Sequence, residues 1–461
     1  MKSLTADFGS TYTKLTAIDS VHLEIVGTAS AFTTVATDLM DGFWDAMQQL
    51  ESNIGAFPYD QLLCCSSAAG GLKMVALGLV PELTAKAART AAASAGAKVV
   101  RTFSFELSKA EQAQIEAINP DLILLCGGTD GGNKEVILTN ARKLGEIEGD
   151  FSIVVAGNKS AADEVSAILS GAGKEFVITE NVMPEFNRLN IEPARQEIKK
   201  LFIERIIHAK GLSTVQSIAS NEIIPTPLAV MNGCELLSKG TGTTAGIGDL
   251  IAVDIGGATT DVYSMSAGTP TLSSVQVKGL PEPYAKRSVE GDLGMRYSLS
   301  SLVETATIEQ VSKEVDVSAD LIKAWVDACR HTPNLLAASD SKEQKIEEGL
   351  ARIAARMAME RHCGSWESAY TPFGQVFVLT GKDLSEVSNV IGIGGVVVNS
   401  SNPAFILEGV KSEGEGSIWA KPKTPRYLVD RRYIFASMGL LSQVNKELAL
   451  TLLKKEITRQ E

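Results

Sequence analysis

Residues 250–265, LIAVDIGGATTDVYSM, are the stretch from which the organisation of the chain follows. An apolar run ends in Asp254, a turn of small residues comes next, and a second extended run begins at Thr260. Apolar residues at every second position predict a half-buried strand before the turn. Gly256 and Gly257 let the backbone turn sharply and approach a ligand closely. The stretch therefore predicts a strand–turn–strand hairpin with a carboxylate where the first strand ends.

The turn of this hairpin has the chemistry of a phosphate site. Free backbone N–H groups and hydroxyls in a turn bind phosphate oxygens. Asp254, at the end of the first strand, would face that phosphate and hold Mg2+, directly or through its water molecules. The hairpin is therefore a candidate phosphate–Mg2+ site.

The start of the chain carries the same device. Residues 4–19, LTADFGSTYTKLTAID, run from an apolar strand through Asp7 and Gly9 to small hydroxyl residues and a second strand. Asp7 and Asp254 are 247 residues apart (254 − 7) in a chain of 461. One D-x-G turn is weak evidence of a site. Two alike, one in each half, predict two related lobes that face each other across one phosphate–Mg2+ site.

Composition excludes several classes of protein. The chain has 44% hydrophobic and 21% charged residues, which is typical of a globular protein, and its length predicts two to four domains. Its net charge of −12 argues against a surface for nucleic acid or anionic membrane. The N-terminus lacks a signal-peptide core, and no apolar run reaches the ~18–20 residues of a membrane span. We therefore expect a cytoplasmic protein.

The cysteines and histidines show no metal-binding pattern. None of the six cysteines forms a C-x-x-C pair, and the four histidines lack a spacing such as H-E-x-x-H. Free, buried thiols are expected in a reducing compartment. The cysteines are Cys64, Cys65, Cys126, Cys234, Cys329 and Cys363.

From about residue 98 the pattern changes to alternating strands and helices. This rhythm predicts a small parallel α/β unit. Its loop GGTDGG (127–132) follows a predicted strand and precedes a predicted helix. Two interpretations stay open: an anion site at a helix N-terminus, or an ordinary tight βα turn.

The two hairpins, DFGST and DIGGATTD, resemble the phosphate motifs of the actin-like ATPase superfamily, which includes heat-shock chaperones, actin and sugar kinases. Other segments are similar to the glutamate mutase accessory protein family. This is the MutL type that accompanies adenosylcobalamin-dependent mutases, and it is unrelated to the mismatch-repair protein of the same name. The segments are PELTAKAARTAAASAGAKVV (81–100), VMPEFNRLNIEPARQEI (182–198), NEIIPTPLAVMNG (221–233), VEGDLGMRYS (289–298) and VIGIGGVVVNS (390–400).

The resemblance extends nearly from end to end and implies an α/β fold. This fold is a two-lobed actin-like ATPase, made of duplicated ribonuclease H-like domains with a small α/β unit inserted in the first lobe. The implied parts are the first lobe (1–97), the insertion (98–220), a connecting helix and loop (221–247), the second lobe (248–429) with a helical subdomain (about 291–370), and C-terminal helices that return to the first lobe (430–461).

The resemblance also implies ATP and Mg2+ as ligands. Asp7 and Asp254 would hold Mg2+ mainly through water, because this ion gives up its hydration reluctantly. Lys14 either neutralises a phosphate or is a solvated strand lysine. Asp261 either orients the attacking water or is a carboxylate at a strand edge. The residues expected to bind phosphate are Gly9, Ser10 and Thr11 on the first hairpin and Gly256, Gly257 and Thr259 on the second.

Two further glycine segments are candidate nucleotide loops. The segment that begins at Gly291 would close over the nucleotide; the alternative is a structural loop with a helix cap at Asp292. Gly392, Gly394 and Gly395 match the position of the adenosine motif. Because residues 379–382 lack the glycine pair that the motif usually places there, the loop that contacts adenine stays open. Residues 384–390, just before this motif, are predicted to form a short helix.

Three functions fit this fold. The leading one is an ATPase that acts as a reactivating chaperone for an adenosylcobalamin-dependent mutase such as glutamate mutase, by coupling hydrolysis to remodelling of the mutase subunits. A small-molecule kinase is an alternative, but no set of sugar-binding residues is identified in the first lobe. An activator of a 2-hydroxyacyl-CoA dehydratase would need a cluster held by cysteines, for which Cys126 beside Gly127 is a thin candidate.

Overall fold

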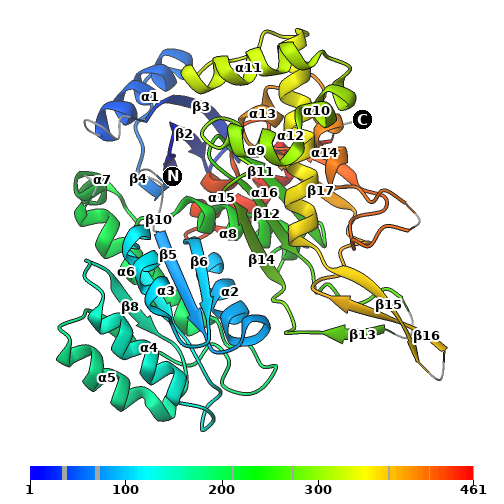
Figure 1. Ribbon diagram of the computed structural model, residues 1–461. Helices are drawn as coiled ribbons and strands as arrows, with labels where there is room; N and C mark the ends of the chain where they lie inside the picture. Colours follow the sequence, from blue (N-terminus) through cyan, green and yellow to red (C-terminus); the bar gives the residue numbers. More distant parts are fainter. Residues whose placement is uncertain are drawn as a thin grey trace. The chain divides into compact units, whose positions relative to one another are not determined.

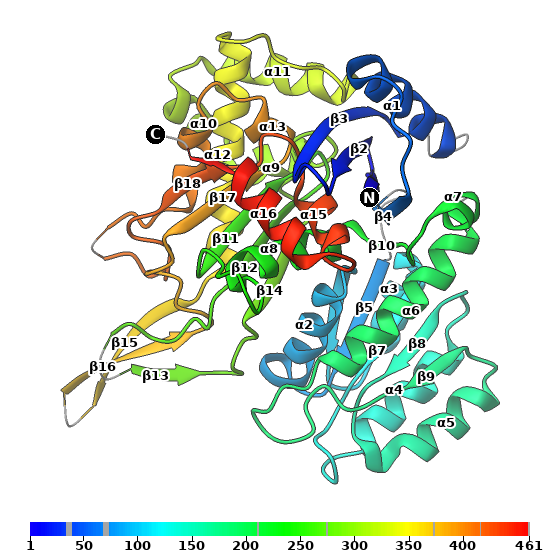
Figure 2. The same ribbon diagram turned by 180° about the vertical axis from the view of Figure 1, so that it is seen from behind.

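The computed structural model describes residues 1–33, 39–67, 73–209, 212–272, 275–371, 374–414 and 416–459. Figures 1 and 2 show the ribbon from two opposite sides. The chain divides into two compact units. Unit 1 comprises Met1–Val230 and Gly279–Pro281, and unit 2 comprises Met231–Lys278 and Glu282–Glu461.

The first sheet of unit 1 has the strand order β10-β4-β1-β2-β3. β1, β2 and β3 are antiparallel neighbours, whereas β4 pairs in parallel with β1, and β10 in parallel with β4. Helix α1 (Leu39–Ile54) packs on β2 and β3, because Phe43, Met47 and Leu50 recur at helical spacing and are buried. The strands are β1 (Lys2–Phe8), β2 (Tyr12–Asp19), β3 (Glu24–Phe32), β4 (Gln61–Ser66) and β10 (Ile224–Pro225).

The main sheet of unit 2 repeats this topology in the order β14-β12-β11-β17-β18-β19. β11, β12 and β14 are antiparallel neighbours, and β17 and β18 continue in parallel with β11. When the strands of each of these two sheets are numbered in chain order, the first five therefore lie in the order 3-2-1-4-5 in both sheets. This confirms the predicted duplication of a ribonuclease H-like domain. The strands are β11 (Leu250–Ile255), β12 (Thr260–Met265), β14 (Ala285–Glu290), β17 (Asn389–Ile393), β18 (Arg426–Val429) and β19 (Thr458–Arg459).

Unit 1 also contains the predicted inserted α/β unit, between β4 and β10. Its five strands are all parallel, in the order β6-β5-β7-β8-β9, which is a doubly wound arrangement. The strands are β5 (Lys73–Gly78), β6 (Lys98–Ser104), β7 (Leu122–Leu125), β8 (Ser152–Val155) and β9 (Phe176–Ile178). The helices are η2 (Pro81–Ala85, a π-helix), α2 (Lys86–Ser94), α3 (Lys109–Ile118), α4 (Glu135–Glu146), η3 (Lys159–Ala161) and α5 (Ala162–Gly171).

The boundary expected at residues 97/98 falls inside this inserted unit. β5 was not predicted as a strand, yet it lies in the interior of the sheet, between β6 and β7. Five of its six residues are buried, so the strand shows no alternation of apolar and polar positions. The inserted sheet therefore begins at Lys73, and the expected boundary separates α2 from β6 within one βαβ connection.

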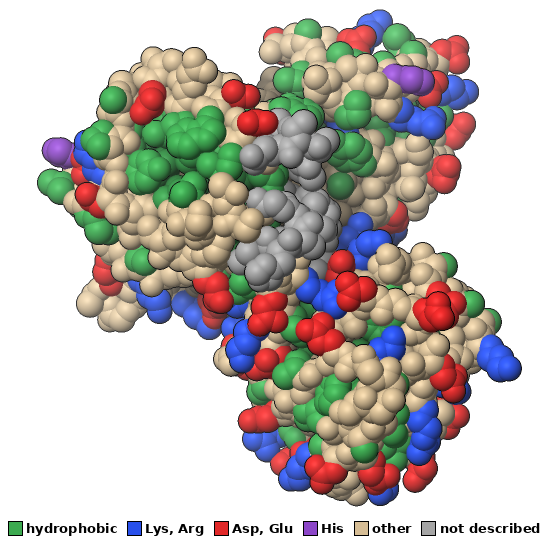
Figure 3. Space-filling model, turned by 90° about the vertical axis from the view of Figure 1, so that its left-hand side faces the viewer, with side chains coloured by type: hydrophobic (Ala, Val, Ile, Leu, Met, Phe, Trp, Pro, Cys, Tyr) green, Lys and Arg blue, Asp and Glu red, His purple; other side chains and the backbone are tan. Residues whose placement is uncertain are grey.

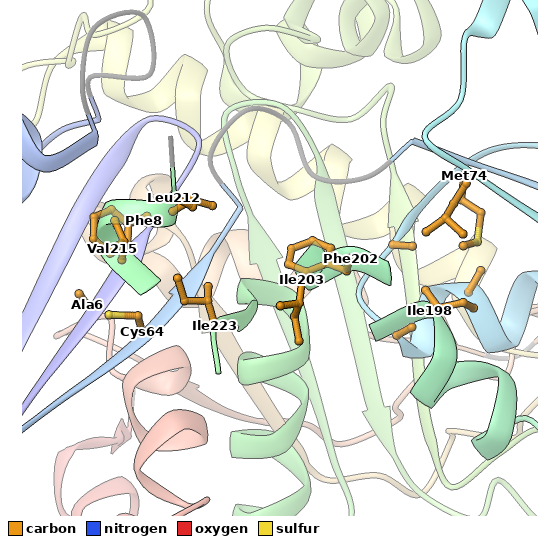
Figure 4. Packing of buried hydrophobic residues seen from close by; sticks show 14 of the residues in the cluster. Ala6, Phe8, Cys64, Met74, Ile198, Phe202, Ile203, Leu212, Val215 and Ile223 are labelled. Atoms are coloured by element: carbon orange, nitrogen blue, oxygen red, sulfur yellow. The ribbon is translucent and has the colours of Figure 1, made fainter. Parts of the chain in front are cut away.

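One hydrophobic core joins the first sheet of unit 1 to the inserted sheet. It continues through α6 (Glu192–Ala209) and α7 (Leu212–Ile218). A separate cluster fills the other face of the inserted sheet. The inserted unit is consequently part of the packing of unit 1 rather than an appendage on a linker. Figure 4 follows the shared core through Ala6, Phe8, Cys64, Leu212, Val215, Ile223, Phe202, Ile203, Ile198 and Met74.

Unit 2 contains the predicted helical region. α12 packs against β11, β12 and β14 and contributes buried Leu350 and Ile353 to the core of this unit. A separate three-stranded sheet has the order β13-β16-β15. These elements are α9 (Leu299–Ala306), α10 (Ile308–Val315), α11 (Ala319–His331), α12 (Lys342–His362), α13 (Gly395–Val398), α14 (Pro403–Leu407), η4 (Glu408–Val410), β13 (Val275–Lys278), β15 (Ser365–Thr371) and β16 (Gly374–Thr380).

The helix predicted for residues 384–390 is wrong. The N–H of Leu384 donates to the carbonyl of Ala420 at 3.1 Å, and the N–H of Ser385 donates to the Asp383 carboxylate at 3.0 Å. Beyond these bonds the segment makes only a short turn at residues 385–386, and the chain enters β17 at Asn389. An apolar pattern of this length does not distinguish a helix from a loop that is held by distant partners.

The C-terminal segment contains α15 (Phe435–Leu441) and α16 (Lys446–Glu456), which pack on each other. The sequence predicted that residues 430–461 return to the first lobe, but their contacts group them with unit 2. β19 also pairs with β18 in the main sheet of that unit. Across the described ranges, the helices are too short or too polar to cross a membrane.

Candidate functional site

The β1–β2 hairpin of unit 1 carries the first predicted phosphate turn. The N–H of Gly9 donates to the carbonyl of Tyr12 at 3.1 Å and closes the turn. A side chain at Gly9 would place its Cβ 2.6 Å from that same oxygen, so the turn requires glycine. Ser10 is exposed and Thr11 is half-buried. The predicted phosphate residues of unit 1 therefore lie together on one turn.

Asp7 lies one residue before the end of β1 and is only 5% exposed. Its Oδ1 accepts a hydrogen bond from the Thr226 hydroxyl at 2.6 Å and a weaker one from the Cys65 thiol at 3.5 Å. Burial, followed by the neighbouring Asp7 charge, raises the pKa of Cys65, so the thiol stays a neutral donor. Lys14, the register partner of Asp7, holds its Nζ 3.8 Å from Asp7 Oδ2.

Thr226 and Cys65 were not identified from the sequence as site residues. Thr226 is the first residue of α8 (Thr226–Lys239), and Pro227 follows it. Proline in the first turn is typical of a helix start, which was a usable signal. The hydrogen bond from the Thr226 hydroxyl holds the beginning of α8 against the Asp7 carboxylate. A helix N-terminus stabilises a nearby negative charge.

The β11–β12 hairpin of unit 2 repeats the geometry of the first turn. The N–H of Gly256 donates to the carbonyl of Thr259 at 2.9 Å. Gly257 is half-buried beside it, as is Asp254 near the end of β11. Asp254 is the register partner of Asp261, so both carboxylates project from the same face of the sheet. The structure thus brings the predicted phosphate and acidic residues of unit 2 together.

Asp261 is a buried residue with a cationic partner on β14. Its Oδ2 accepts two hydrogen bonds from Arg287, at 3.1 Å from Nε and 2.7 Å from Nη2. Burial opposes the charge of Arg287, but the Asp261 carboxylate outweighs it, so the pKa of Arg287 lies above its usual value. Asp261 Oδ1 is buried and has no hydrogen-bond partner among the described residues. Arg287 was also missed at the sequence level.

The segment after β14 lies directly on the second turn. The N–H groups of Met295, Arg296 and Tyr297 donate to the carbonyls of Gly256 and Gly257 at 2.8–3.0 Å. The hydroxyl of Thr260, next to this turn, donates to the Leu293 carbonyl at 2.7 Å. A Cβ at Gly294 would lie 2.4 Å from the backbone carbon of Ala258, so this close approach requires glycine.

Gly291 is exposed and follows Glu290, which is the register partner of Thr260. Asp292 does not cap a helix, because α9 begins only at Leu299. Instead its carboxylate binds Arg361 through two hydrogen bonds of 2.7 and 2.9 Å. The hydrogen bonds from the Arg361 side chain are the main reason that the pKa of Asp292 is lowered. The predicted loop thus ends beside the second turn.

The glycines of the proposed adenosine motif have different surroundings. Gly394 has a φ of +98° and would place a Cβ 2.3 Å from the Ile255 carbonyl oxygen, so this turn abuts the end of β11. Gly395 begins α13, near the Tyr433 hydroxyl. Gly392 lies inside β17, where a Cβ would meet the side chains of Val397 and Leu407. Packing alone accounts for glycine at position 392.

The GGTDGG loop (127–132) is tied to its own unit by two buried asparagines. Asn158 accepts from the N–H of Gly131 and donates to the carbonyls of Gly132 and Asn133. Asn181 donates to the carbonyl of Gly128 at 3.0 Å. These hydrogen bonds hold the loop in place from within the inserted unit, as expected of an ordinary βα turn.

The donor atoms on the two hairpins suit Mg2+ and phosphate. Mg2+ prefers oxygen ligands and commonly takes one or two carboxylates together with water and phosphate. Asp7 and Asp254 offer such oxygens beside turns that carry glycine and hydroxyl groups. Asp261 Oδ1 is a buried acceptor that lacks a donor within the described ranges. Within those ranges no group of three or more His, Cys, Asp or Glu side chains could hold a metal by itself.

The repeated sheet order, with an Asp-containing hairpin at the start of each sheet, defines an α/β protein of the actin-like ATPase fold. The MutL protein family matches residues 3–457. Protein MutL of Clostridium tetanomorphum is 46% identical over 462 residues, which cover 99% of this chain and 99% of that protein. The chain therefore belongs to the MutL protein family.

Some solved structures are also similar, though only loosely. One is xylulose kinase from Bifidobacterium adolescentis, with 13% identity and a TM-score of 0.34 over 100% of this chain and 96% of that one. Another is a glycerol dehydratase reactivase, with 10% identity and a TM-score of 0.34 over 96% of this chain and 100% of that one. The strand order within each unit, rather than these likenesses, defines the fold.

Proposed function

We propose that this protein is an ATP-dependent accessory factor that restores activity to an adenosylcobalamin-dependent mutase. The observation that carries the proposal is the paired hairpin, with Asp7 and Asp254 at matching places in two sheets of the same order. Membership of the MutL family supports the choice of a mutase as the partner. The protein would act on mutase subunits in the cytoplasm, with neither nucleic acid nor membrane as a partner.

Both hairpins would serve one nucleotide. Asp7 and Asp254 would hold Mg2+ through its water molecules, while the two turns position the phosphates. Gly291, Gly394 and Gly395 would lie toward the nucleotide from unit 2. Bound ATP supplies the phosphoryl group whose transfer to water releases energy, and Mg2+ offsets the negative charge of the phosphates. Asp261 would orient the water.

Hydrolysis would change the protein rather than make a product for the cell. A nucleotide that contacts one conformation better than another shifts the balance between them. A partner that is bound to one conformation is then strained when the other becomes favoured. A mutase that holds a cobalamin without its adenosyl group would release the damaged cofactor and accept an intact one.

We also infer that the inserted unit provides the surface for the mutase. Figure 3 shows acidic and basic side chains interspersed with apolar ones over this unit, in the lower part of the view. Exposed apolar side chains of this region could serve as anchors for a protein partner. They are Val100 at 41%, Phe105 at 59%, Ile178 at 39% and Phe186 at 70%.

The dehydratase-activator alternative loses support in the structure. Cys126, its candidate cluster ligand, is 1% exposed, and burial raises the pKa of this thiol. A cluster shared between two subunits needs thiolates at a surface. The small-molecule kinase has no observation in its favour beyond the fold, and fold alone does not define activity.

The direct test is mutase turnover after exposure to hydroxocobalamin. The partner mutase from the source cell is first blocked, then incubated with this protein, MgATP and fresh adenosylcobalamin. We expect turnover to return only when ATP and the wild-type protein are both present, and to stay absent with Asp254→Ala. Equal recovery without ATP would contradict the proposal. Phosphorylation of a small metabolite at an ordinary enzymatic rate would establish the kinase instead.

Docking is tested separately, with surface variants. Removing the whole inserted unit would open the core that it shares with the first sheet, so deletion is a poor test. Phe186→Ser and Phe105→Ser should weaken mutase capture at least ~10-fold, since apolar anchors commonly contribute 1–2 kcal/mol or more to binding. Affinity for MgATP, measured by calorimetry, should not change. Tyr370→Ser, at a side chain that is 82% exposed on β15 of unit 2, is the matched control.

A further inference from the structure

Arg287 is a buried cation that the sequence analysis did not assign to the site. It lies on β14 as the register partner of Tyr263, and its side chain is only 4% exposed. From there it reaches two residues along β12 to the Asp261 carboxylate. Its guanidinium carbon also lies 5.8 Å from the centre of the Tyr263 ring. A buried arginine of this kind has one fixed orientation, because its Nε and Nη2 both donate to the same oxygen.

The two oxygens of Asp261 are unequal. Oδ2 accepts both hydrogen bonds from Arg287 and lies 3.4 Å from the Tyr263 hydroxyl. Oδ1 is buried and accepts none from the described residues. A buried carboxylate oxygen without a donor is costly, so such an atom in a folded protein calls for a water molecule or another donor. Asp254 projects from the same face of the hairpin, which places this open acceptor beside the predicted Mg2+ carboxylate.

We propose that Arg287 is a positioning residue for ATP hydrolysis: it fixes Asp261 so that Oδ1 accepts a hydrogen bond from the attacking water. The proposal rests on the ATPase function proposed above. The water oxygen forms a bond to the terminal phosphorus as the bond from that phosphorus to the bridging oxygen breaks. The products are ADP, phosphate and a proton, which leaves with phosphate or solvent. Asp261, already paired with a fixed cation, orients the water and does not keep its proton.

The hairpin of unit 1 lacks the same arrangement. Lys14 occupies the register position that Asp261 occupies in unit 2, opposite Asp7 rather than Asp254. A lysine ammonium has no acceptor atom, so it cannot accept a hydrogen bond from water. Of the two hairpins, only the second offers a carboxylate for this purpose.

The test compares kcat and KM for ATP hydrolysis in full-length variants. Arg287→Met removes the cation with little change in size, and Arg287→Lys keeps the charge but not the two-bond geometry. Arg205→Met is the matched control, because Arg205 is a half-buried arginine that is paired with Asp150 and Glu175 in the inserted unit. Asp261→Asn combined with Arg287→Met removes both charges, so it guards against misfolding caused by an unpaired carboxylate.

We expect Arg287→Met to lower kcat by about 100-fold, with KM for ATP changed less than ~3-fold, because a misplaced group costs rate rather than binding. Arg287→Lys should recover part of kcat, because it keeps a cation beside Asp261. Arg205→Met should keep the kcat and KM of the wild type.

The possible failures can be told apart. Wild-type protein that does not hydrolyse MgATP overturns both the ATPase function and the role of Arg287. Hydrolysis by the wild type with the same kcat in Arg287→Met overturns only the role of Arg287. A loss of kcat that Arg287→Lys does not relieve, or one matched by an equally large change in KM, also overturns it, since a purely structural role would give that result.

Discussion

The β1–β2 hairpin of unit 1 and the β11–β12 hairpin of unit 2 share one backbone plan but carry different charges. In each hairpin an aspartate lies near the end of the first strand, and a glycine N–H donates to the carbonyl three residues later and closes the turn. Each hairpin also forms the first two strands of a sheet with the same strand order. The position opposite the aspartate is Lys14 in unit 1 and Asp261 in unit 2. In unit 1 the hairpin supplies its own cation, whereas in unit 2 the cation comes from β14 as Arg287. The two hairpins thus share the geometry of their turns but differ in where their cation comes from.

The largest expected effect tests what the two hairpins share. Asp7→Ala and Asp254→Ala should each lower ATP hydrolysis by at least ~100-fold, because each removes an oxygen that stabilises Mg2+ and the developing charge. Both variants should fold, as judged by circular dichroism. Asp320→Ala, at an exposed position of α11, is the control and should keep full activity. A large loss in only one of the two variants would show that the hairpins do not serve one nucleotide.

The next effect tests how the hairpins differ. Asp261→Asn should lower kcat by about 30-fold, because the amide offers its Oδ1 without the charge that orients water. Lys14→Met should lower it less than ~3-fold, since a partly exposed pair at 3.8 Å contributes little. Steady-state hydrolysis at saturating MgATP measures both values. Equal losses would mean that the two hairpins act alike in spite of their charges.

A third effect concerns how tightly the two turns close. A Cβ at Gly9 would lie 2.6 Å from the Tyr12 carbonyl oxygen, whereas one at Gly256 would lie 3.1 Å from the Thr259 oxygen. Gly9→Ala should therefore destabilise unit 1 by about 2 kcal/mol, and Gly256→Ala should destabilise unit 2 by less than ~1 kcal/mol. Urea denaturation, followed by probes in each unit, gives the comparison. A larger cost at Gly256 would contradict the order of these two Cβ distances.

The last comparison contrasts the buried charges of the two units. Among the described residues, buried Lys, Arg and His side chains occur only in unit 2. Lys382, 1% exposed, donates to the carbonyls of Pro283 and Tyr284 and to Ser264. Burial, assisted by the neighbouring Lys286 charge, lowers the pKa of Lys382 to about 7.

The sign of the resulting pH dependence follows from the number of protons bound. Below about pH 7 both states hold the Lys382 proton, and the cost of burying the charge is fully present. Between that value and the ordinary lysine pKa only the unfolded state holds it, so stability rises with pH by up to ~1.4 kcal/mol per pH unit. Unfolding of unit 2 between pH 7 and 9 should show this rise, and Lys382→Met should flatten it. Lys423→Met, at an exposed lysine, is the control.

His362 adds a dependence on the acid side. It is fully buried between Ser264 and Ser288, and burial holds its pKa well below the usual histidine value. Below about pH 6.5 His362 therefore binds a proton in the unfolded state but stays neutral in the folded state, so the stability of the protein falls as the pH falls. His362→Gln should weaken this acid loss. The same loss in the variant would mean that other groups cause it.

What the sequence determined by itself was mostly local. An aspartate at the end of an apolar run, followed by small residues, specifies a tight hairpin through turn chemistry that needs no distant partner. That is why both hairpin turns, and the alternating strands and helices of the inserted unit, could be predicted. The similarity of the two hairpin sequences also predicted that the fold is duplicated, because equivalent hairpins form the first strands of two sheets with the same order.

Only the tertiary structure decided which distant groups meet. β5 joins the interior of the inserted sheet through parallel pairing with β6 and β7, a choice that a short, fully buried run does not reveal. Residues 384–390 form no helix, because after a short turn the chain joins β17 at Asn389, where it pairs in parallel with β11. Thr226 reaches Asp7 across 219 residues, and Arg287 reaches Asp261 across 26. Such contacts depend on sheet register and helix placement, which no local pattern encodes.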